Sequence, residues 1–166
     1  MKRLVWLNEN ELKKIRLIAD REDKSTRSKI HPGGVTNSQL NKYDQFTGNA
    51  GEAALSKFLT GSIDLYLKTK QERELSNWTG DYTSDLLGLQ VDVKTSRMRH
   101  GPDFPYHLWI RSMEYHHKTK YVLALMPVDR DDLVLLIGWI EGSDIGPPSD
   151  KFSDRREVPI ERLRPM

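Results

Sequence analysis

The segment TSDLLGLQVDVKTS, residues 83–96, constrains the fold more than any other part of the chain. Apolar and polar residues alternate on both sides of Gly88-Leu89. This pattern predicts two strands, over residues 82–87 and 90–96, joined by a two-residue turn. Glycine at the first central position of the turn suits a type II′ hairpin.

This register places two carboxylates and an ammonium on one face of the hairpin. Asp85 is expected directly opposite Asp92, and Lys94 follows Asp92 by two residues, so the pleat turns it to the same face. Val91 and Val93 point the other way, into the core. Directly opposite side chains have Cβ atoms about 4.5–5.5 Å apart, and two carboxylates in such positions repel each other unless a divalent cation lies between them. The alternative interpretation is a trio of surface salt bridges.

Carboxylates beside an ammonium suit the hydrolysis of phosphodiesters. Mg²⁺ binds through one or two carboxylates, keeps several waters and binds substrate phosphates; Mn²⁺ is expected to substitute for it. The metal lowers the pKa of a bound water, and an ammonium orients that water or stabilises the charge of the transition state. The hairpin therefore predicts a Mg²⁺-dependent phosphodiester hydrolase.

The spacing of Asp85 and Asp92-Val93-Lys94 resembles the signature of the PD-(D/E)xK nuclease superfamily, which includes restriction endonucleases, Holliday-junction resolvases and phage recombination nucleases. Gly51-Glu52-Ala53-Ala54 is similar to the Gly-Glu helix start that many members place before the two strands. The resemblance covers residues from about 48 to 97, and more loosely to 140. It implies an α/β (α+β) fold with a restriction-endonuclease-like αβββαβ core, a central mixed sheet flanked by helices.

The resemblance also implies roles for individual residues. The implied catalytic set is Glu52, Asp85, Asp92 and Lys94, and the implied metal ligands are Asp85, Asp92, the Val93 carbonyl and Glu52. Lys94 would be the catalytic lysine, and Glu52 an auxiliary ligand or the residue that orients a metal-bound water. Asp81 is an alternative first acid, because it lies four residues before Asp85 and shares its face in a regular strand.

The distribution of charge favours a DNA partner more than the net charge of +2 does. Residues 94–120 include six Lys or Arg residues and only two acids. Residues 24–29 include three Lys or Arg residues and no acid. Such stretches suit phosphate contact, although each alone can be solvated surface. The expected DNA-contacting residues are Thr95, Ser96, Arg97, Arg99, Lys24, Arg27 and Lys29.

The expected function is that of a metal-dependent deoxyribonuclease, acting on DNA that includes branched intermediates of recombination and repair. One alternative is a non-catalytic DNA-binding module of the same fold, and another is a hydrolase of small phosphoesters. A junction resolvase would be a symmetric dimer, so a homodimer is compatible with this function.

The 166 residues, 37% of them hydrophobic, predict a single domain spanning 1–166. The chain lacks cysteine, which excludes disulfides and thiolate zinc sites. Neither a secretory signal nor a run long enough to span a membrane is present, so a cytoplasmic protein without membrane contact is expected.

Periodicity predicts the remaining elements. Asn8 and Glu11 form a capping box before a helix over residues 9–21, and Gly48-Asn49 opens a second helix to about Leu59. Residues 22–47 between them are expected to form a long loop or arm. Further strands are predicted at 63–68, where Ile63, Leu65 and Leu67 alternate with polar residues, and at 106–110, 121–126 and 133–140, with Trp109 and Trp139 in the core.

Overall fold

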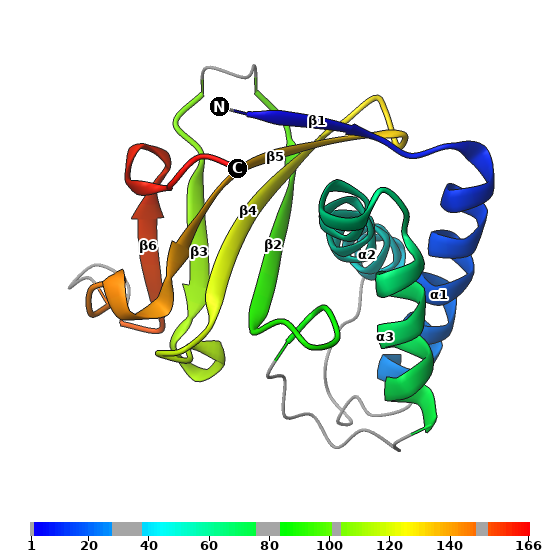
Figure 1. Ribbon diagram of the computed structural model, residues 1–166, viewed down its shortest axis with the longest axis horizontal. Helices are drawn as coiled ribbons and strands as arrows, with labels where there is room; N and C mark the ends of the chain where they lie inside the picture. The colour runs from blue at the N-terminus through cyan, green and yellow to red at the C-terminus, as the bar shows by residue number, and fades with distance from the viewer. Residues whose placement is uncertain (1, 28–37, 76–83, 101–103, 149–152) are drawn as a thin grey trace.

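The computed structural model describes residues 2–27, 38–75, 84–100, 104–148 and 153–166. They form a mixed α/β fold in which helices cover one face of a four-stranded sheet and a two-stranded ribbon covers the other (Figure 1). The helices are α1 (Glu9–Arg27), α2 (Ser38–Thr60) and α3 (Asp64–Leu75). The strands are β1 (Arg3–Trp6), β2 (Val91–Met98), β3 (His107–Arg111), β4 (Lys120–Pro127), β5 (Leu133–Glu141) and β6 (Arg155–Pro159). Short 3₁₀ turns are η1 (Ser112–Glu114), η2 (Gly142–Asp144) and η3 (Ile160–Arg162).

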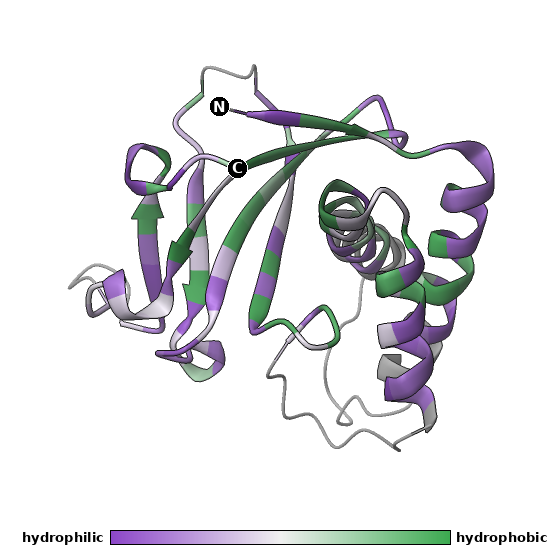
Figure 2. Ribbon diagram, in the orientation of Figure 1, coloured by the Kyte–Doolittle hydropathy of each residue, from purple (hydrophilic) through white to green (hydrophobic). Residues whose placement is uncertain are grey.

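The four-stranded sheet has the order β1-β5-β4-β2. β4 and β5 pair antiparallel, which confirms the prediction for these two apolar runs, whereas β2 pairs parallel to β4. Both central strands are hydrophobic along most of their length (Figure 2) because both of their faces are covered. In β4 the side chains toward the helices are Val122, Ala124 and Met126, and those toward the ribbon are Tyr121, Leu123 and Leu125.

The capping box is confirmed. The Asn8 backbone N–H donates to Glu11 Oε2 at 2.7 Å, and the Glu11 N–H donates to Asn8 Oδ1 at 3.0 Å. The prediction of a loop over residues 22–47 is wrong at both ends, because α1 continues to Arg27 and α2 begins at Ser38. Phe46 precedes Ala50 by one helical turn and both are buried, so the apolar stripe of α2 starts before Gly48.

The predicted strand at 63–68 is also wrong, because this segment begins α3. The buried positions are Ile63, Tyr66, Thr69 and Lys70, which recur at helical spacing. The Leu67 N–H donates to the Ile63 carbonyl at 3.0 Å, one helical turn back. An alternation of only three apolar residues is therefore compatible with the spacing of a strand and with that of a helix.

The turn of the predicted hairpin lies one residue earlier than expected. Leu86 bridges to Leu89, and Gly88 takes a positive φ of 75° at the second central position of the turn. Asp85 is consequently not opposite Asp92; its N–H donates to the Val91 carbonyl at 2.7 Å. The second predicted strand forms as β2, whereas in the described part of the first, residues 84–87, only Leu86 takes part in a bridge. Asp81 and Lys29 lie outside the described residues.

The succession of elements differs from the expected αβββαβ order. In the described part of the chain, three helices precede β2, and only 3₁₀ turns separate the strands after it. The sheet is mixed, as expected, but its helices lie on one face (Figure 1), because the β3–β6 ribbon occupies the other. None of the helices in the described residues combines the length and apolar character needed to cross a membrane.

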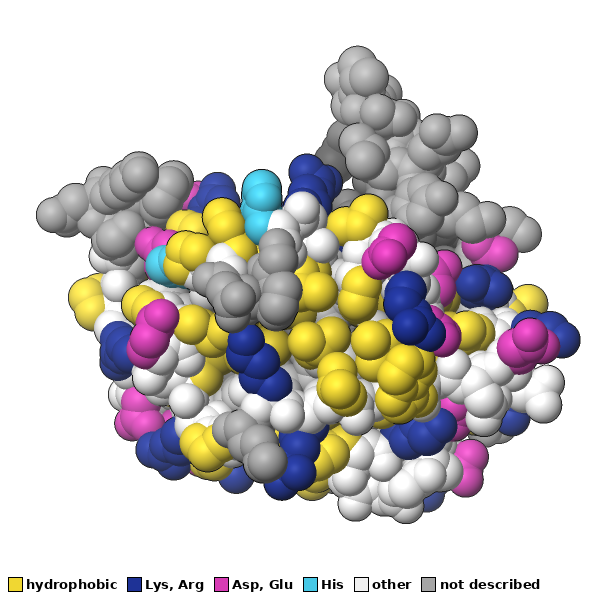
Figure 3. Space-filling view, turned by 90° about the horizontal axis from the view of Figure 1, so that it is seen from above, with side chains coloured by type: hydrophobic (Ala, Val, Ile, Leu, Met, Phe, Trp, Pro, Cys, Tyr) yellow, Lys and Arg dark blue, Asp and Glu magenta, His cyan; other side chains and the backbone are white. Residues whose placement is uncertain are grey.

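Two strands were not predicted. β1 pairs with β5 at one edge of the sheet, and β6 pairs with β3 in the ribbon. On β1, Leu4 and Trp6 are 60% and 51% exposed. Figure 3, which views the molecule from the side where β1 lies, shows hydrophobic side chains among Lys and Arg on this surface.

Candidate active site

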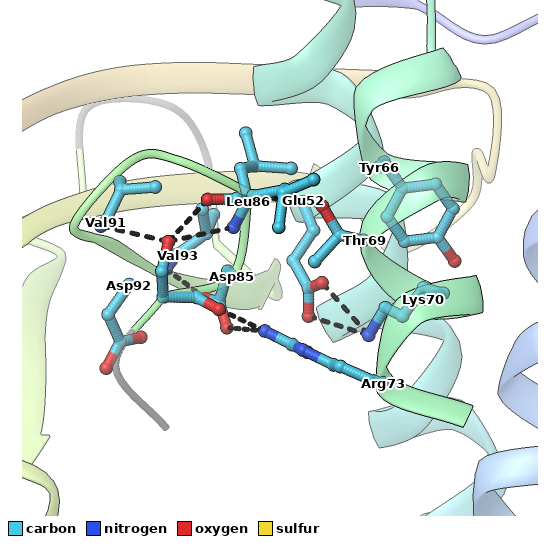
Figure 4. A network of polar contacts seen from close by, with 12 residues as sticks. Glu52, Tyr66, Thr69, Lys70, Arg73, Asp85, Leu86, Val91, Asp92 and Val93 are labelled. Atoms are coloured by element: carbon cyan, nitrogen blue, oxygen red, sulfur yellow. Dashed lines mark hydrogen bonds and ion pairs between the residues drawn. The ribbon is translucent and has the colours of Figure 1, made fainter. Parts of the chain in front are cut away.

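The residues predicted to carry the chemistry meet at the outer edge of β2. Asp92 and Lys94 lie on this strand. Asp85 lies in the turn beside it, and Glu52 comes from α2 (Figure 4). β2 is the last strand of the sheet, so its outer edge is available to Asp85. Asp85 Oδ2 accepts the Val93 N–H at 2.6 Å, which fixes this carboxylate against the strand.

The three carboxylates form a row, in which Asp85 lies between Glu52 and Asp92 (Figure 4). The negative charge of Asp85 contributes to the raised pKa of both of the other groups. The predicted face is confirmed for Asp92 and Lys94, since Lys94 Nζ lies 3.0 Å from Asp92 Oδ2. Val91 and Val93 point into the core between the sheet and the helices.

Glu52 reaches this row because α2 approaches β2 closely at Gly51. A Cβ atom at Gly51 would lie 1.9 Å from Thr95 Oγ1 and 3.0 Å from Thr95 Cβ. Only glycine therefore fits between the helix and the strand at this point. The glycine of the Gly-Glu pair thus has a packing role, and Glu52 is brought to the row as its neighbour.

Two cations of α3 neutralise part of the row. Lys70 Nζ lies 3.0 Å from Glu52 Oε2 and 2.9 Å from Glu22 Oε1, and its side chain is only 7% exposed. Arg73, one helical turn later, lies 3.6 Å from Asp85 Oδ1 and also donates to the Ser84 carbonyl. Sequence reasoning missed both cations because it read residues 63–68 as a strand and assigned no element to the residues that continue α3. Their spacing of three residues, which suits one face of a helix, was the available signal.

A fourth carboxylate, Glu114 of η1, also contacts Lys94. Lys94 Nζ donates to Glu114 Oε2 at 2.7 Å. The buried Tyr121 holds this turn in place: its hydroxyl donates to the Glu114 carbonyl at 3.2 Å and accepts the His116 N–H at 2.7 Å. Lys94 is thus held between Asp92 and Glu114. No local pattern indicated Glu114, which lies 20 residues beyond Lys94.

Burial dominates the protonation of the row. It raises the pKa of Glu52 to about 8, although Lys70 opposes the shift. Burial, and then the charge of Asp85, raise the pKa of Asp92 to about 7. Burial also raises the pKa of Asp85, although the hydrogen bond from the Val93 N–H opposes this shift. Burial lowers the pKa of Lys94, but Asp92 and Glu114 outweigh it and raise the pKa to about 12. Glu52 and Asp92 therefore hold their protons more tightly than exposed carboxyl groups do, whereas Lys94 keeps its positive charge.

The donor set fits a hard divalent cation that keeps part of its water shell. Asp85 and Asp92 supply oxygen donors, and Mg²⁺ is typically bound through one or two carboxylates. Within the described ranges, no three Asp, Glu or His side chains converge as the ligands of a metal ion do. Both oxygens of Glu52 lie within 3.3 Å of Lys70. This contact suits Glu52 to orienting a neighbour better than to direct ligation.

The predicted DNA-contacting residues are placed in different ways. Arg97 is held inside the fold by Asp131 at 2.7 Å and by the Pro127 carbonyl at 3.0 Å. Thr95 faces α2, where its Oγ1 is buried without a hydrogen-bond partner. Ser96 and Arg99 are exposed. Lys24 and Arg27 fall in the last turns of α1.

Comparisons of the chain with protein-family models, with curated proteins and with solved structures give no match. The interpretation of the site therefore depends on its residues and their geometry.

Proposed function

We propose that this protein is a metal-dependent deoxyribonuclease of the PD-(D/E)xK type, with Asp85, Asp92 and Lys94 at its reactive centre. The observation that carries the proposal is the row of three carboxylates at the edge of β2, in which Glu52 and Asp85 are buried and Asp92 is half-buried, with the Lys94 ammonium 3.0 Å from Asp92. Buried carboxylates that repel one another are costly in an ordinary sheet edge. A divalent cation would turn this repulsion into binding energy.

Asp85, Asp92 and the Val93 carbonyl would hold the cation, which we propose to be Mg²⁺ or Mn²⁺. When bound, it would activate a water and neutralise charge on the phosphate. Glu52, positioned by Lys70, would orient that water. Lys94 would stabilise the negative charge that develops on the phosphate oxygens. A pKa of about 12 keeps its ammonium charged during the reaction.

The family relation and a restriction-endonuclease-like core belong to this proposal as well. They are supported by the packing of α2 across β2, by the Gly51-Glu52 pair at that contact, and by the Asp-x-Lys strand running parallel to β4. Branched DNA is included among the proposed substrates because junction resolvases belong to the superfamily that the motif resembles.

The first test is cleavage of linear, nicked and four-way-junction DNA with Mg²⁺, Mn²⁺ or EDTA. We expect cleavage with either metal and none with EDTA. Lys94→Met should lower the rate by about 10²–10³-fold, because a charge aimed at the transition state is lost. Lys68→Met changes an exposed lysine of α3 and serves as the matched control, with wild-type activity expected.

Cleavage that persists in EDTA, or full activity of the Lys94→Met protein, would contradict the proposal. DNA binding without cleavage by any of these metals would favour the non-catalytic DNA-binding module instead.

We also expect the affinity for Mn²⁺ to rise with pH up to about 7 and then to level off. The proton on Asp92, whose pKa is raised to about 7, must leave before the carboxylate binds a cation. Each pH unit below this value should weaken binding by about tenfold. Titration of the protein with Mn²⁺, followed by electron paramagnetic resonance between about pH 5.5 and pH 8, measures this dependence. A constant affinity over the range would show that Asp92 is not a ligand.

A further inference from the structure

The outer face of the β3–β6 ribbon carries a partly exposed tryptophan. In β3, Leu108 and Ile110 are fully buried, whereas Trp109 between them points outward and is 37% exposed. This corrects the expectation that Trp109 lies in the core. The Arg155 guanidinium lies 5.5 Å from the centre of the indole ring, and the His107 ring lies 6.1 Å from it. An indole with a guanidinium over its ring combines the stacking and cation–π contacts that bind nucleic-acid bases.

Two arginines lie side by side on the same face. Arg111 is directly opposite Arg155 in the pairing of β3 with β6, and like charges in this position repel each other. Two carboxylates compensate in part: Glu114 lies 3.8 Å from Arg111, and Asp154 lies 3.1 Å from Arg155. Arg111 remains 73% exposed. A phosphate between the two guanidiniums would replace the repulsion by charge-assisted hydrogen bonds.

This face is linked to the candidate active site through Glu114. Glu114 contacts Arg111 and also accepts the hydrogen bond from Lys94 at 2.7 Å. The contacts therefore lead from the ribbon through Arg111 and Glu114 to the catalytic lysine. A strand bound along the ribbon would be led toward the row of carboxylates.

We propose that Trp109, Arg111 and Arg155, here called the β3–β6 strip, bind an unpaired DNA strand beside the active site. A base would stack on Trp109, and phosphates would contact the two arginines. The strand is unpaired because bases inside a duplex present no face to an indole. This inference rests on the proposed nuclease function and specifies the substrate that the site receives.

The test is the affinity for a fluorescein-labelled single strand and for its duplex, measured by anisotropy on the Asp92→Asn protein in EDTA, where no cleavage occurs. Trp109→Ala should weaken single-strand binding by about tenfold or more, because one stacking contact is lost, and should leave duplex binding nearly unchanged. Arg111→Gln should reduce the slope of log affinity against log salt by about 0.7. Trp6→Ala is the matched control: Trp6 is 51% exposed with the Arg130 guanidinium 4.7 Å from its ring, but it lies on β1.

Equal losses of single-strand affinity in the Trp109→Ala and Trp6→Ala proteins would overturn the proposed role of the β3–β6 strip. So would equal losses of affinity for the single strand and for the duplex. If the wild-type protein cleaves DNA and the Trp109→Ala protein keeps full affinity for the single strand, the proposed role of the β3–β6 strip is contradicted and the nuclease function is not. Trp109-dependent binding by a wild-type protein that cleaves no DNA with any metal would contradict the nuclease function alone.

Discussion

Replacing Asp92 by asparagine is expected to lower metal-dependent DNA cleavage by at least about 10²–10³-fold. Asparagine has nearly the shape of aspartate but cannot supply the negative charge that binds a divalent cation. It also removes one of the two carboxylates that hold Lys94, which lies 3.0 Å from Asp92 Oδ2. Both changes act on the proposed reactive centre and leave the core untouched.

The Asp92→Asn protein should nevertheless fold as well as the wild type. The pKa of Asp92 is raised by burial and by Asp85 from 3.8 to about 7, so ionisation of this group favours the unfolded chain. Its contribution to stability is full below about pH 3.8 and is lost as the pH rises through about 7. A neutral asparagine avoids this loss, and the variant should be at least as stable as the wild type at pH 8.

Cleavage rates and urea unfolding at about pH 8 together distinguish these effects. Asp129→Asn, which changes an exposed aspartate in the turn between β4 and β5, is the matched control and should cleave normally. Wild-type activity of Asp92→Asn would remove the basis for a metal centre at β2. Loss of activity together with a large loss of stability would show that Asp92 acts through the fold.

Replacing Gly51 by alanine is expected to destabilise the protein by about 1–3 kcal/mol, the cost of overpacking a close contact. The added Cβ would lie 1.9 Å from Thr95 Oγ1 and 3.0 Å from Thr95 Cβ, so α2 must move away from β2. Glu52 would move with the helix. We therefore expect the cleavage rate to fall as well, even though Gly51 takes no part in the chemistry.

Gly48→Ala on the same helix is the matched control. A Cβ at Gly48 meets nothing within 4 Å, so this change should stabilise the helix by about 0.5–1 kcal/mol. Thr95→Ala should remove most of the penalty, since it deletes Oγ1 and Cγ2. Urea unfolding of the single and double variants gives a double-mutant cycle with a clear coupling energy between positions 51 and 95. Equal stabilities for Gly51→Ala and Gly48→Ala would contradict the close approach.

Local patterns were enough where neighbours in the chain decide the outcome. The Asn8–Glu11 capping box forms within four residues. Asp92 and Lys94 share a face because the pleat of a strand repeats every two residues. The apolar runs of β4 and β5 were long enough to exclude other elements, and the short acidic turn between them favoured antiparallel pairing.

Tertiary structure decided the rest. The segment with Ile63, Leu65 and Leu67 forms a helix rather than a strand because helical spacing places Tyr66 and Lys70 on the buried face. Because the turn is shifted by one residue, Asp85 accepts a hydrogen bond from the backbone of β2. This contact is possible because β2 is the last strand of the sheet. Periodicity describes only the residues within an element, and it carries no information about what that element will contact.

In the candidate site, too, some residues follow from local patterns and others only from tertiary structure. Its acids and its lysine could be identified from the sequence, since strand spacing and the resemblance both indicate them. Lys70, Arg73 and Glu114, which neutralise or hold those groups, come from α3 and η1 and meet the row only after the chain has folded. The sequence by itself thus determined which groups carry the charge, whereas long-range packing determined which partners balance it, because burial and distance govern these interactions.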